Sequence, residues 1–475
     1  MRAYLKRVKS HSGYWSCERC IQRRVQWPLR PTASEEQASK RRANEATKSK
    51  KKIKKIIQLR ETNPPPRVDE DFYTYCKSDI VEDEHIINFN DLSPFSEIDF
   101  KMVSGFIIDS MHTVYGAFSR RLKGISSVKH EGKLKVELLA AVNARLELFA
   151  KCKPLEFDRT VRQLTKSVNN YKDAELRQFL YYLLFPVFHK ILEKKQLENL
   201  MLLPQSMLLL GSYNPEPVPA EKSGEARRLL KLYVEQMKEF EFPIRFLTHN
   251  AIHVPEDVIN HQTGVETLDA FVYENVHRVF RDILGSGNKP VEQIRNRLTE
   301  RNKYLLPTSA DGLILSHAED FYAQAELMEQ KEAGPKHILL EFVDKGERFP
   351  KKLRFAKFTL STVFPDNICL LNNGKVFVCK EISKNPRNNN LTLSGFRFQS
   401  TTTAFQQPYP STDYHIQIVS KLEEYLHDIS IQQIKEKVYA LPMSISGEEL
   451  ISDEIPDTSC KNTKWYVSPL FHTLY

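Results

Sequence analysis

The sequence has 475 residues, a formal net charge of +9 and 41% hydrophobic residues, which together indicate a globular chain with about two to four domains. No stretch approaches the ~20 consecutive apolar residues that a membrane helix needs, and the first residues lack the apolar core of a secretory signal. Seven cysteines are scattered unevenly, which argues against a disulfide scaffold and for a reducing compartment.

A close cysteine pair stands near the start of the chain, in the segment SHSGYWSCERCIQRR. Cys17 and Cys20 have the two-residue gap that lets two thiolates reach one tetrahedral Zn²⁺. A complete site needs two more ligands, and His85 and His112 downstream are candidates. The alternative is a pair of reduced, half-buried cysteines with no metal.

Much of the positive charge is concentrated in residues 39–60, SKRRANEATKSKKKIKKIIQLR. Such a lysine-rich run attracts polyanions and also serves as a nuclear import signal. We therefore expect the segment Lys40–Lys55 to contact DNA and the protein to be nuclear. A solvated linker without a partner remains the alternative.

The remaining pattern predicts an α+β chain: a mainly α-helical middle region followed by a small C-terminal β-rich domain. Residues 103–124 read as a buried strand feeding a helix, and residues 133–210 and 268–284 carry apolar positions at helical spacing. After Pro335 the apolar residues recur at every second position, which is typical of β-strands, and Asn372–Gly374 is typical of a hairpin turn. The expected boundaries are a Cys-pair zinc knuckle at 1–28, a basic linker at 29–66, a helical region at 67–305, a helical linker at 306–335, a β-rich module at 336–440 and a tail at 441–475.

Three further groups could carry chemistry. Asp109 follows a hydrophobic run, where acidic groups often meet metal or substrate, although an aspartate that caps the next helix looks the same. Glu274 stands on an apolar helical face as a candidate metal ligand, but an ion pair with Arg278 one turn later is the favoured interpretation on spacing alone. His249 and His253 have the spacing of a metal pair on one helix face, but with no third ligand nearby in the sequence we expect structural histidines.

Several of these segments together resemble the CACTA-type (En/Spm-like) transposases and the host-encoded proteins descended from them. The string KRVKSHSGYWSCERCIQRR is similar to the family's cysteine-bearing insertion. Further similarities follow in the family's order, in ETNPPPRVDEDF, EDEHII, FIIDSMHTVYGAFSRRL, YKDAELRQFLYYL, DAFVYENVHRVFRDILGSGNKPVEQI and FAKFTLSTVFPDNICLLNNGKVFV.

The resemblance implies an RNase H-like core interrupted by a helical insertion, in which three acids hold two Mg²⁺ for DNA cleavage and strand transfer. Glu274 matches the glutamate of that triad, and Asp109 lies in the segment similar to the family's Asp-Met-His signature. The family's first two aspartates lie upstream of the cysteine insertion, and this sequence begins a few residues before it. We therefore expect both to be missing and the Mg²⁺ site, with its nuclease activity, to be lost.

These similarities predict a transposase-derived, DNA-associated nuclear protein without catalytic activity. The sequence would then be either a degenerate fragment of a transposable element or a partial gene model. One alternative is an active transposase or endonuclease completed by an upstream segment. Another is a non-catalytic nuclear protein that binds a partner. A homo-oligomer is compatible with each of the three.

Overall fold

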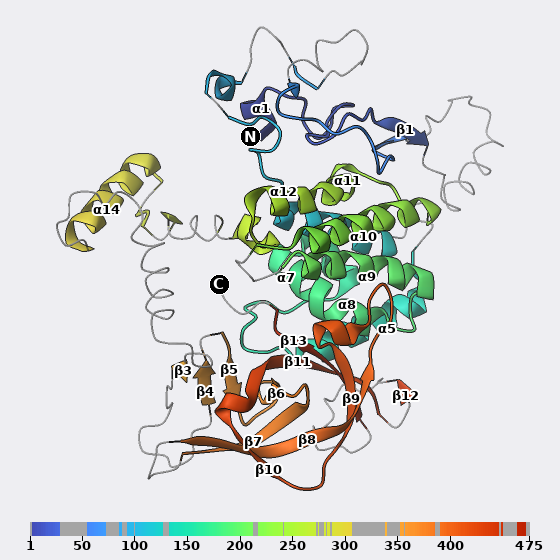
Figure 1. The fold of residues 1–475 in the computed structure, drawn as a ribbon, viewed down its shortest axis with the longest axis vertical. Coiled ribbons are helices and arrows are strands. Elements are labelled where there is room, and N and C mark those ends of the chain that lie inside the picture. The colour runs from blue at the N-terminus through green and yellow to red at the C-terminus, as the bar shows by residue number, and fades with distance from the viewer. Residues whose placement is uncertain are drawn as a thin grey trace, which may run out of the picture. The chain divides into compact units, whose positions relative to one another are not determined.

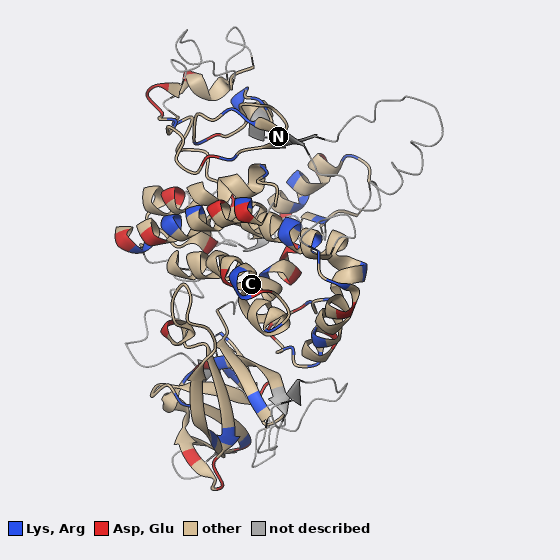
Figure 2. Cartoon of the chain, turned by 90° about the vertical axis from the view of Figure 1, so that its right-hand side faces the viewer, with Lys and Arg blue, Asp and Glu red and all other residues tan. Residues whose placement is uncertain are grey.

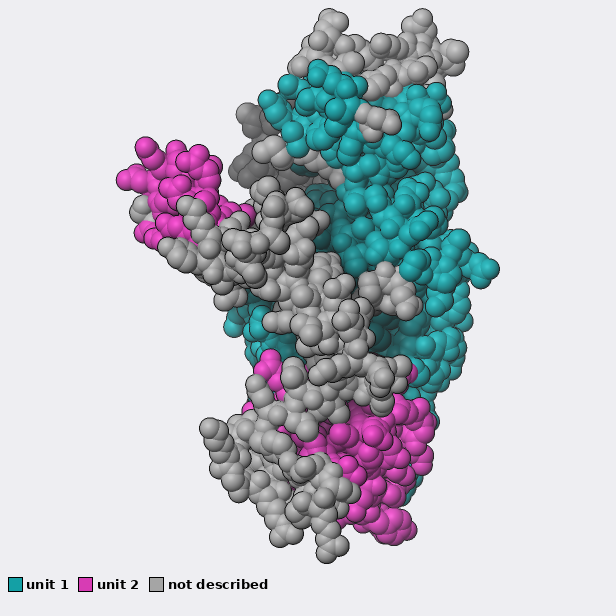
Figure 3. Space-filling view, turned by 60° about the vertical axis from the view of Figure 1, so that its left-hand side comes forward, with its two compact units in different colours: residues 1–269, 398–422, 438–472 teal, residues 270–397, 423–437, 473–475 magenta. Residues whose placement is uncertain are grey.

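The computed structural model divides the chain into two compact units, coloured separately in Figure 3. Unit 1 comprises residues 1–269, 398–422 and 438–472, and unit 2 comprises residues 270–397, 423–437 and 473–475. The structure describes residues 2–28, 55–72, 85–87, 93–98, 100–126, 133–211, 217–240, 242–271, 274, 280–281, 283–285, 287–305, 338–339, 352–355, 357–384, 390–445, 448–449 and 463–471.

The N-terminal part of unit 1 is a short-element segment held together by backbone hydrogen bonds. Helix α1 (Arg2–Lys6) is followed by loops and by β1 (Val25–Pro28), which pairs antiparallel with β2 (Lys55–Gln58). Further along, the backbone of Ile21 bonds to that of Pro65 at 2.8 Å, and the backbone of Lys9 bonds to that of His85, also at 2.8 Å. Stretches far apart in the sequence thereby fix the loop that carries Cys17 and Cys20.

The strand predicted at the start of residues 103–124 is wrong. Residues 102–106 form turns and a bend, and the helical structure begins at the π-helical turn η2 (Met111–Tyr115), which continues as α4 (Gly116–Ser126). The N–H groups of Val103 and Ser104 donate to the Asp69 carboxylate at 2.6 and 3.2 Å. Because those donors are bonded to a side chain, they cannot form a strand ladder, although Val103 itself is buried.

The helical middle region is confirmed. Its long members pack by apolar faces: in α10 (Ala220–Glu239) the side chains of Leu229, Leu230, Tyr233 and Val234 are fully buried. Each buried side chain of this size contributes about 1.5–3 kcal/mol, so the apolar stripe holds α10 in the bundle. The other helical elements of the region are α5 (Val136–Ala150), α6 (Leu164–Ser167), η3 (Val168–Asn170), α7 (Asp173–Gln178), η4 (Phe179–Leu183), α8 (Leu184–Phe188), α9 (Lys194–Leu209), α11 (Phe246–Asn250), η5 (Ala251–His253), α12 (Val254–His261) and η6 (Val265–Leu268).

Two further helical elements come before and after this region in the sequence. The short η1 (Pro94–Glu97) belongs to unit 1, and α14 (Pro290–Leu305) belongs to unit 2. None of the helices in the described part of the chain is both long and apolar enough to cross a membrane. The expected helical linker at 306–335 lies outside the described residues.

The C-terminal β-region is also confirmed, and the chain is α+β at this level (Figure 1). The turn at Asn372–Gly374 joins β6 (Ile368–Leu371) to β7 (Val376–Lys384) as predicted, with Gly374 at φ +80°. Every strand pair in the described residues is antiparallel. The other strands are β3 (Ile338–Leu339), β4 (Lys352–Phe355), β5 (Thr359–Ser361), β8 (Leu391–Thr403), β9 (Gln417–Leu422), β10 (His427–Ser430), β11 (Ile434–Ile445), β12 (Glu448–Glu449) and β13 (Thr463–Pro469).

Strands β8 and β11 each contribute residues to both units. In unit 2, β7 pairs with β6 and β8 over a core that includes Leu360, Phe377 and Leu393. In unit 1, β13 pairs with β9 and β11. The pairing of β13 places Thr463–Pro469 in a sheet, within the range that the sequence pattern suggested as a tail.

Candidate metal centre

Four potential metal ligands from two distant parts of the chain come together inside unit 1. Cys17 and Cys20 lie on the loop before β1, His249 lies in α11, and His253 ends η5. The two histidines are four residues apart on consecutive helical turns, so their rings fall on the same face. All four side chains are buried, at 0%, 1%, 0% and 4% exposure respectively.

The ligand atoms have the separations of a tetrahedral site. Cys20 Sγ lies 3.2 Å from His249 Nε2, and Cys17 Sγ lies 3.6 Å from His253 Nε2. The two Nε2 atoms are 3.3 Å apart, and all four ligand atoms lie within 4.8 Å of one another. A tetrahedral Zn²⁺ with bonds of about 2.3 Å to sulfur and about 2.0 Å to nitrogen separates its ligands by roughly 3.3–3.8 Å. These four side chains could therefore hold one metal ion without a large rearrangement.

The electrostatics of the pair also suit a cation. Burial raises the pKa of the Cys17 thiol, but a hydrogen bond with Cys20 and the charges of His249 and His253 outweigh it, so the pKa lies well below its ordinary value. The pKa of Cys20 is raised, first by burial and then by its contact with the Cys17 sulfur. The pair thus favours one thiolate, and a bound metal ion would displace the second proton, because thiols coordinate as thiolates.

The contacts around the cluster tie the same two chain segments together. Between the cysteines, Arg19 donates to Asp257 Oδ1 at 2.5 Å and to the carbonyl oxygen of Phe106 at 2.8 Å. Asp257 lies one turn after His253, and its other oxygen accepts from the N–H of Ile108 at 2.7 Å. The ion pair is nearly completely buried, with side-chain exposures of 2% and 0%. Outer contacts of this kind hold first ligands in place.

The cysteine loop receives further support from polar residues upstream and downstream. Arg67 Nε donates to the carbonyl oxygen of Cys17 at 3.1 Å. The buried Lys6 ammonium donates to Glu18 at 2.9 Å. The loop conformation that presents the two thiols is therefore fixed by bonds that do not involve the metal ligands' own side chains.

The structure places the histidines named from the sequence in other surroundings. His85 is buried, and its Nδ1 lies 2.7 Å from the carbonyl oxygen of Trp15, so it supports the loop backbone. His112 is on η2, where its ring pairs with the carboxylate of Asp109. The imidazoles that complete the cysteine cluster come from His249 and His253 instead. His249 and His253 were expected to be structural for want of a third ligand nearby in the sequence, and the fold places two thiols beside them.

The two acidic candidates have different environments. Asp109 accepts from the N–H of Met111 at 3.0 Å and of His112 at 3.3 Å, which is the helix-capping geometry that the sequence left open. Glu274 is exposed and belongs to unit 2, whereas Asp109 belongs to unit 1. Arg278, the expected partner of Glu274, lies outside the described residues, as do residues 40–54 of the basic segment.

Comparison with known proteins gives one match. Residues 331–452 match a domain of unknown function, DUF8592. No curated protein and no solved structure matches the chain. The matched range spans the predicted β-rich module at 336–440, and the Cys17–Cys20–His249–His253 cluster lies outside it.

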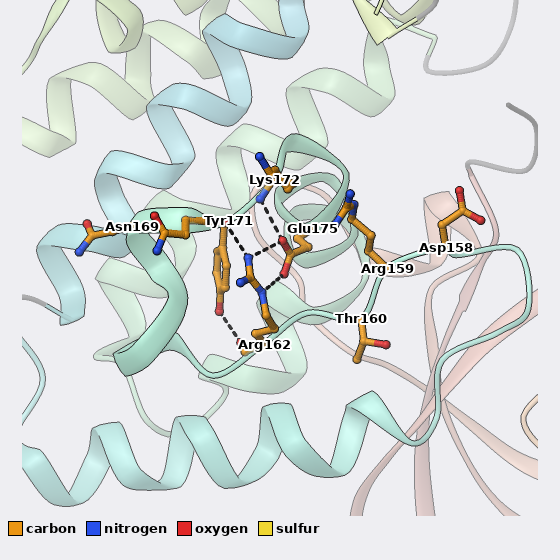
Figure 4. Close-up of a pocket in the computed structure, with 9 residues that line it drawn as sticks. Asp158, Arg159, Thr160, Arg162, Asn169, Tyr171, Lys172 and Glu175 are labelled. Carbon is orange, nitrogen blue, oxygen red and sulfur yellow. Dashed lines mark hydrogen bonds and ion pairs between the residues drawn. The ribbon is translucent and has the colours of Figure 1, made fainter. Parts of the chain in front are cut away.

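A surface pocket of about 760 Å³ provides a second polar site in the helical region (Figure 4). At its centre, Arg162 donates to both oxygens of Glu175 at 2.8 Å and also to the carbonyl oxygen of Asn170. The hydrogen bond to Glu175 raises the pKa of Arg162. Glu175 also accepts from the N–H of Lys172 at 3.0 Å, so the carboxylate of this ion pair caps the N-terminus of α7. The remaining lining residues are Asp158, Arg159, Thr160, Asn169 and Tyr171.

Sequence inspection could have paired the metal ligands only by combining two separate signals. Cys17-x2-Cys20 and His249-x3-His253 together match the ligand spacing of Cys2His2 zinc sites. In zinc fingers the two halves are close in sequence, whereas here 228 residues separate Cys20 from His249. Distance along the chain concealed the match.

Proposed function

We propose that this chain is a transposase-derived protein in which one structural Zn²⁺ clasps the N-terminal segment to the helical region, and which associates with DNA without cleaving it. The observation that carries the proposal is the buried Cys2His2 cluster. It joins the very segment that resembles the transposase cysteine insertion to the helical elements α11 and η5.

Zinc is the metal that best fits the donor set. Two thiolates and two imidazoles at tetrahedral separations are ligands that Zn²⁺ prefers, whereas Mg²⁺ and Ca²⁺ take oxygen ligands. All four positions are supplied by the protein, and the site is buried. A closed site of this kind is structural, because a catalytic zinc keeps one position for water or substrate.

The DNA association and the nuclear location rest on the family resemblance and on charge. The net charge of +9 and the lysine-rich run at 39–60 favour contact with a polyanion. An RNase H-like origin of the helical region belongs to the same proposal.

The absence of cleavage is inferred from the acidic residues. Of the family's triad, Glu274 is the member with a counterpart in these 475 residues, and one carboxylate cannot hold two Mg²⁺ ions. We expect no nicking or joining of supercoiled plasmid in the presence of Mg²⁺. Cleavage that stops in Glu274→Gln would establish the alternative, an active transposase.

Metal analysis of the purified full chain tests the zinc assignment. We expect about one equivalent of zinc, lost in Cys17→Ser with Cys20→Ser and strongly reduced in His249→Asn. The exposed His112 provides a matched control, and His112→Asn should retain the metal. A reduced, folded wild-type protein without zinc would rule the assignment out, and loss in His112→Asn with retention in His249→Asn would favour the other ligand set.

A further inference from the structure

Three arginines from separate elements gather beside the metal centre. Arg24 directly precedes β1, Arg120 lies on α4, and Arg245 directly precedes α11. Helices α4 and α11 touch closely, since a Cβ atom added at Gly116 would lie 2.5 Å from a methyl carbon of Leu247. Arg120 is one turn after Gly116, and Arg245 is two residues before Leu247, so the backbones of both arginines lie close to this contact.

Arg24 is brought to the same place by the N-terminal segment. Its guanidinium lies 5.7 Å from the ring centroid of Phe246, the residue after Arg245. It also donates to the carbonyl oxygen of His11 at 2.6 Å, and the His11 ring lies 6.3 Å from that of Phe246. Basic and aromatic side chains therefore share one surface, which we call the arginine surface and define by Arg24, Arg120 and Arg245.

These charges lack acidic partners within the described residues. Arg19, Arg162 and Arg228 each form an ion pair with a carboxylate. No carboxylate in the described part of the chain pairs with any member of the arginine surface. The buried Nε of Arg24 has no hydrogen-bond partner there either.

The arginines also interact unfavourably with one another. The pKa of Arg120 is lowered, first by partial burial and then by the charge of Arg245. Burial lowers the pKa of Arg24 as well; the Cys17 thiolate opposes this effect and the charge of Arg120 adds to it. Like charges held together without counter-ions attract a polyanion, whose binding relieves the repulsion.

We infer that the arginine surface is a binding site for the phosphate backbone of duplex DNA, and that the metal clasp assembles it. Arg120 and Arg245 are exposed and make the phosphate contacts, while the buried Arg24 adds a positive charge that interacts with that of Arg120. Arg24 stands four residues after the ligand Cys20, so release of the cysteine loop removes its charge from the surface. Figure 2 shows Lys and Arg on the N-terminal segment as well as on the helices of unit 1. This inference rests on the proposed DNA association and locates it on the folded part of the chain, apart from the lysine-rich run.

Binding of the zinc-loaded full chain to a labelled duplex, measured over a range of salt concentrations, tests the inference. Arg120→Gln with Arg245→Gln should reduce the slope of log affinity against log salt by about 1.8, since each phosphate contact contributes about 0.9. The loss of affinity should therefore be roughly ten-fold greater at about 50 mM salt than at about 200 mM salt. The matched control is Lys166→Gln with Lys195→Gln, which removes two exposed charges elsewhere on unit 1 and should leave the slope nearly unchanged.

Two further arms separate the outcomes. Removal of zinc with a chelator should weaken binding by the wild type and have a smaller effect on the double arginine variant. Lys50→Gln with Lys51→Gln and Lys52→Gln measures the lysine-rich run independently. Another outcome is that the wild type binds DNA while the double arginine variant and the control variant, Lys166→Gln with Lys195→Gln, lose affinity equally. In that case the arginine surface is not the site, although DNA association stands. If the wild type binds no duplex at all, both the inference and the proposed DNA association are overturned.

Discussion

The sulfur of Cys20 lies 3.2 Å from Nε2 of His249, although the two residues are 229 positions apart in the sequence. Metal coordination between them closes a long loop, and most of the helical region lies within it. The ligands come together only in the folded state, so the binding free energy of the metal adds to the free energy of folding. The metal centre is therefore a candidate determinant of stability.

Removal of the metal should loosen the N-terminal segment first. A ligand that binds only the folded state stabilises it by about 4 kcal/mol when its free concentration is about 1,000 times Kd. We expect a chelator to lower the melting temperature and to expose residues near Cys17 to protease while α9 and α10 stay protected. Thermal melts and limited proteolysis with mass spectrometry measure both effects. Identical cleavage with and without chelator would contradict the proposal that the metal holds the N-terminal segment to the helical region.

The ion pair between Arg19 and Asp257 should also contribute strongly to holding the N-terminal segment on the helical region. Removing one partner of a buried pair leaves an uncompensated charge and typically costs about 3–5 kcal/mol. We expect a loss of this size for Asp257→Asn in urea unfolding. The exposed pair Arg297–Glu300, with side-chain exposures of 64% and 56%, is the comparison. Glu300→Gln should cost less than about 1 kcal/mol, and equal losses in the two variants would refute the argument.

Two glycines should respond to alanine with opposite signs. At Gly395 on β8, an added Cβ would lie 2.0 Å from the carbonyl oxygen of Val378 on the paired strand β7, and a backbone atom cannot turn aside. Gly395→Ala should therefore lower the free energy of unfolding by roughly 1–3 kcal/mol. Gly224 lies within α10 and has no atom within 4 Å of an added Cβ. Gly224→Ala should raise the stability by about 0.5–1 kcal/mol, because alanine is the better helix former.

Glu266 should make the stability depend on pH. Burial raises the pKa of its carboxyl group above the ordinary 4.5, while hydrogen bonds with Asp269 and Tyr115 oppose the shift. The folded state therefore keeps a proton that the unfolded state releases, so this contribution to stability is complete below pH 4.5 and is lost as pH rises through the folded pKa. Glu266→Gln should flatten the fall in stability above pH 4.5.

Glu225 provides a comparison of opposite sign for that measurement. Its pKa is lowered, chiefly by the hydrogen bond from Arg228, so its contribution is present above pH 4.5 and is lost as pH falls through the lowered pKa. In urea unfolding at a series of pH values, the free energy of unfolding of Glu225→Gln should fall below that of the wild type by an amount that grows from acid toward neutral pH. A Glu266→Gln profile parallel to the wild type would count against the buried-carboxyl explanation.

Local patterns in the sequence predicted the elements whose structure depends on near neighbours. The apolar spacing of residues such as Leu229 and Tyr233 indicated a helix because a 3.6-residue period places them on one buried face. Asn372–Gly374 indicated a hairpin because Gly374 readily adopts the positive φ of that turn. The prediction of a strand at Val103 failed for a related reason. Val103 and Ile108 are buried as expected, but the Asp69 side chain accepts hydrogen bonds from the N–H groups of Val103 and Ser104 that a strand would need.

By itself, the sequence determined that the middle of the chain is helical, that its C-terminal region is β-rich, and that Cys17 and Cys20 are spaced to share a metal. Only the tertiary structure decided which side chains complete the site and which arginines surround it. The spacing of His249 and His253 had suggested two structural histidines, because the thiols that face them are supplied by a loop more than two hundred residues away. Coordination depends on where atoms lie in space, and distance along the chain does not specify it.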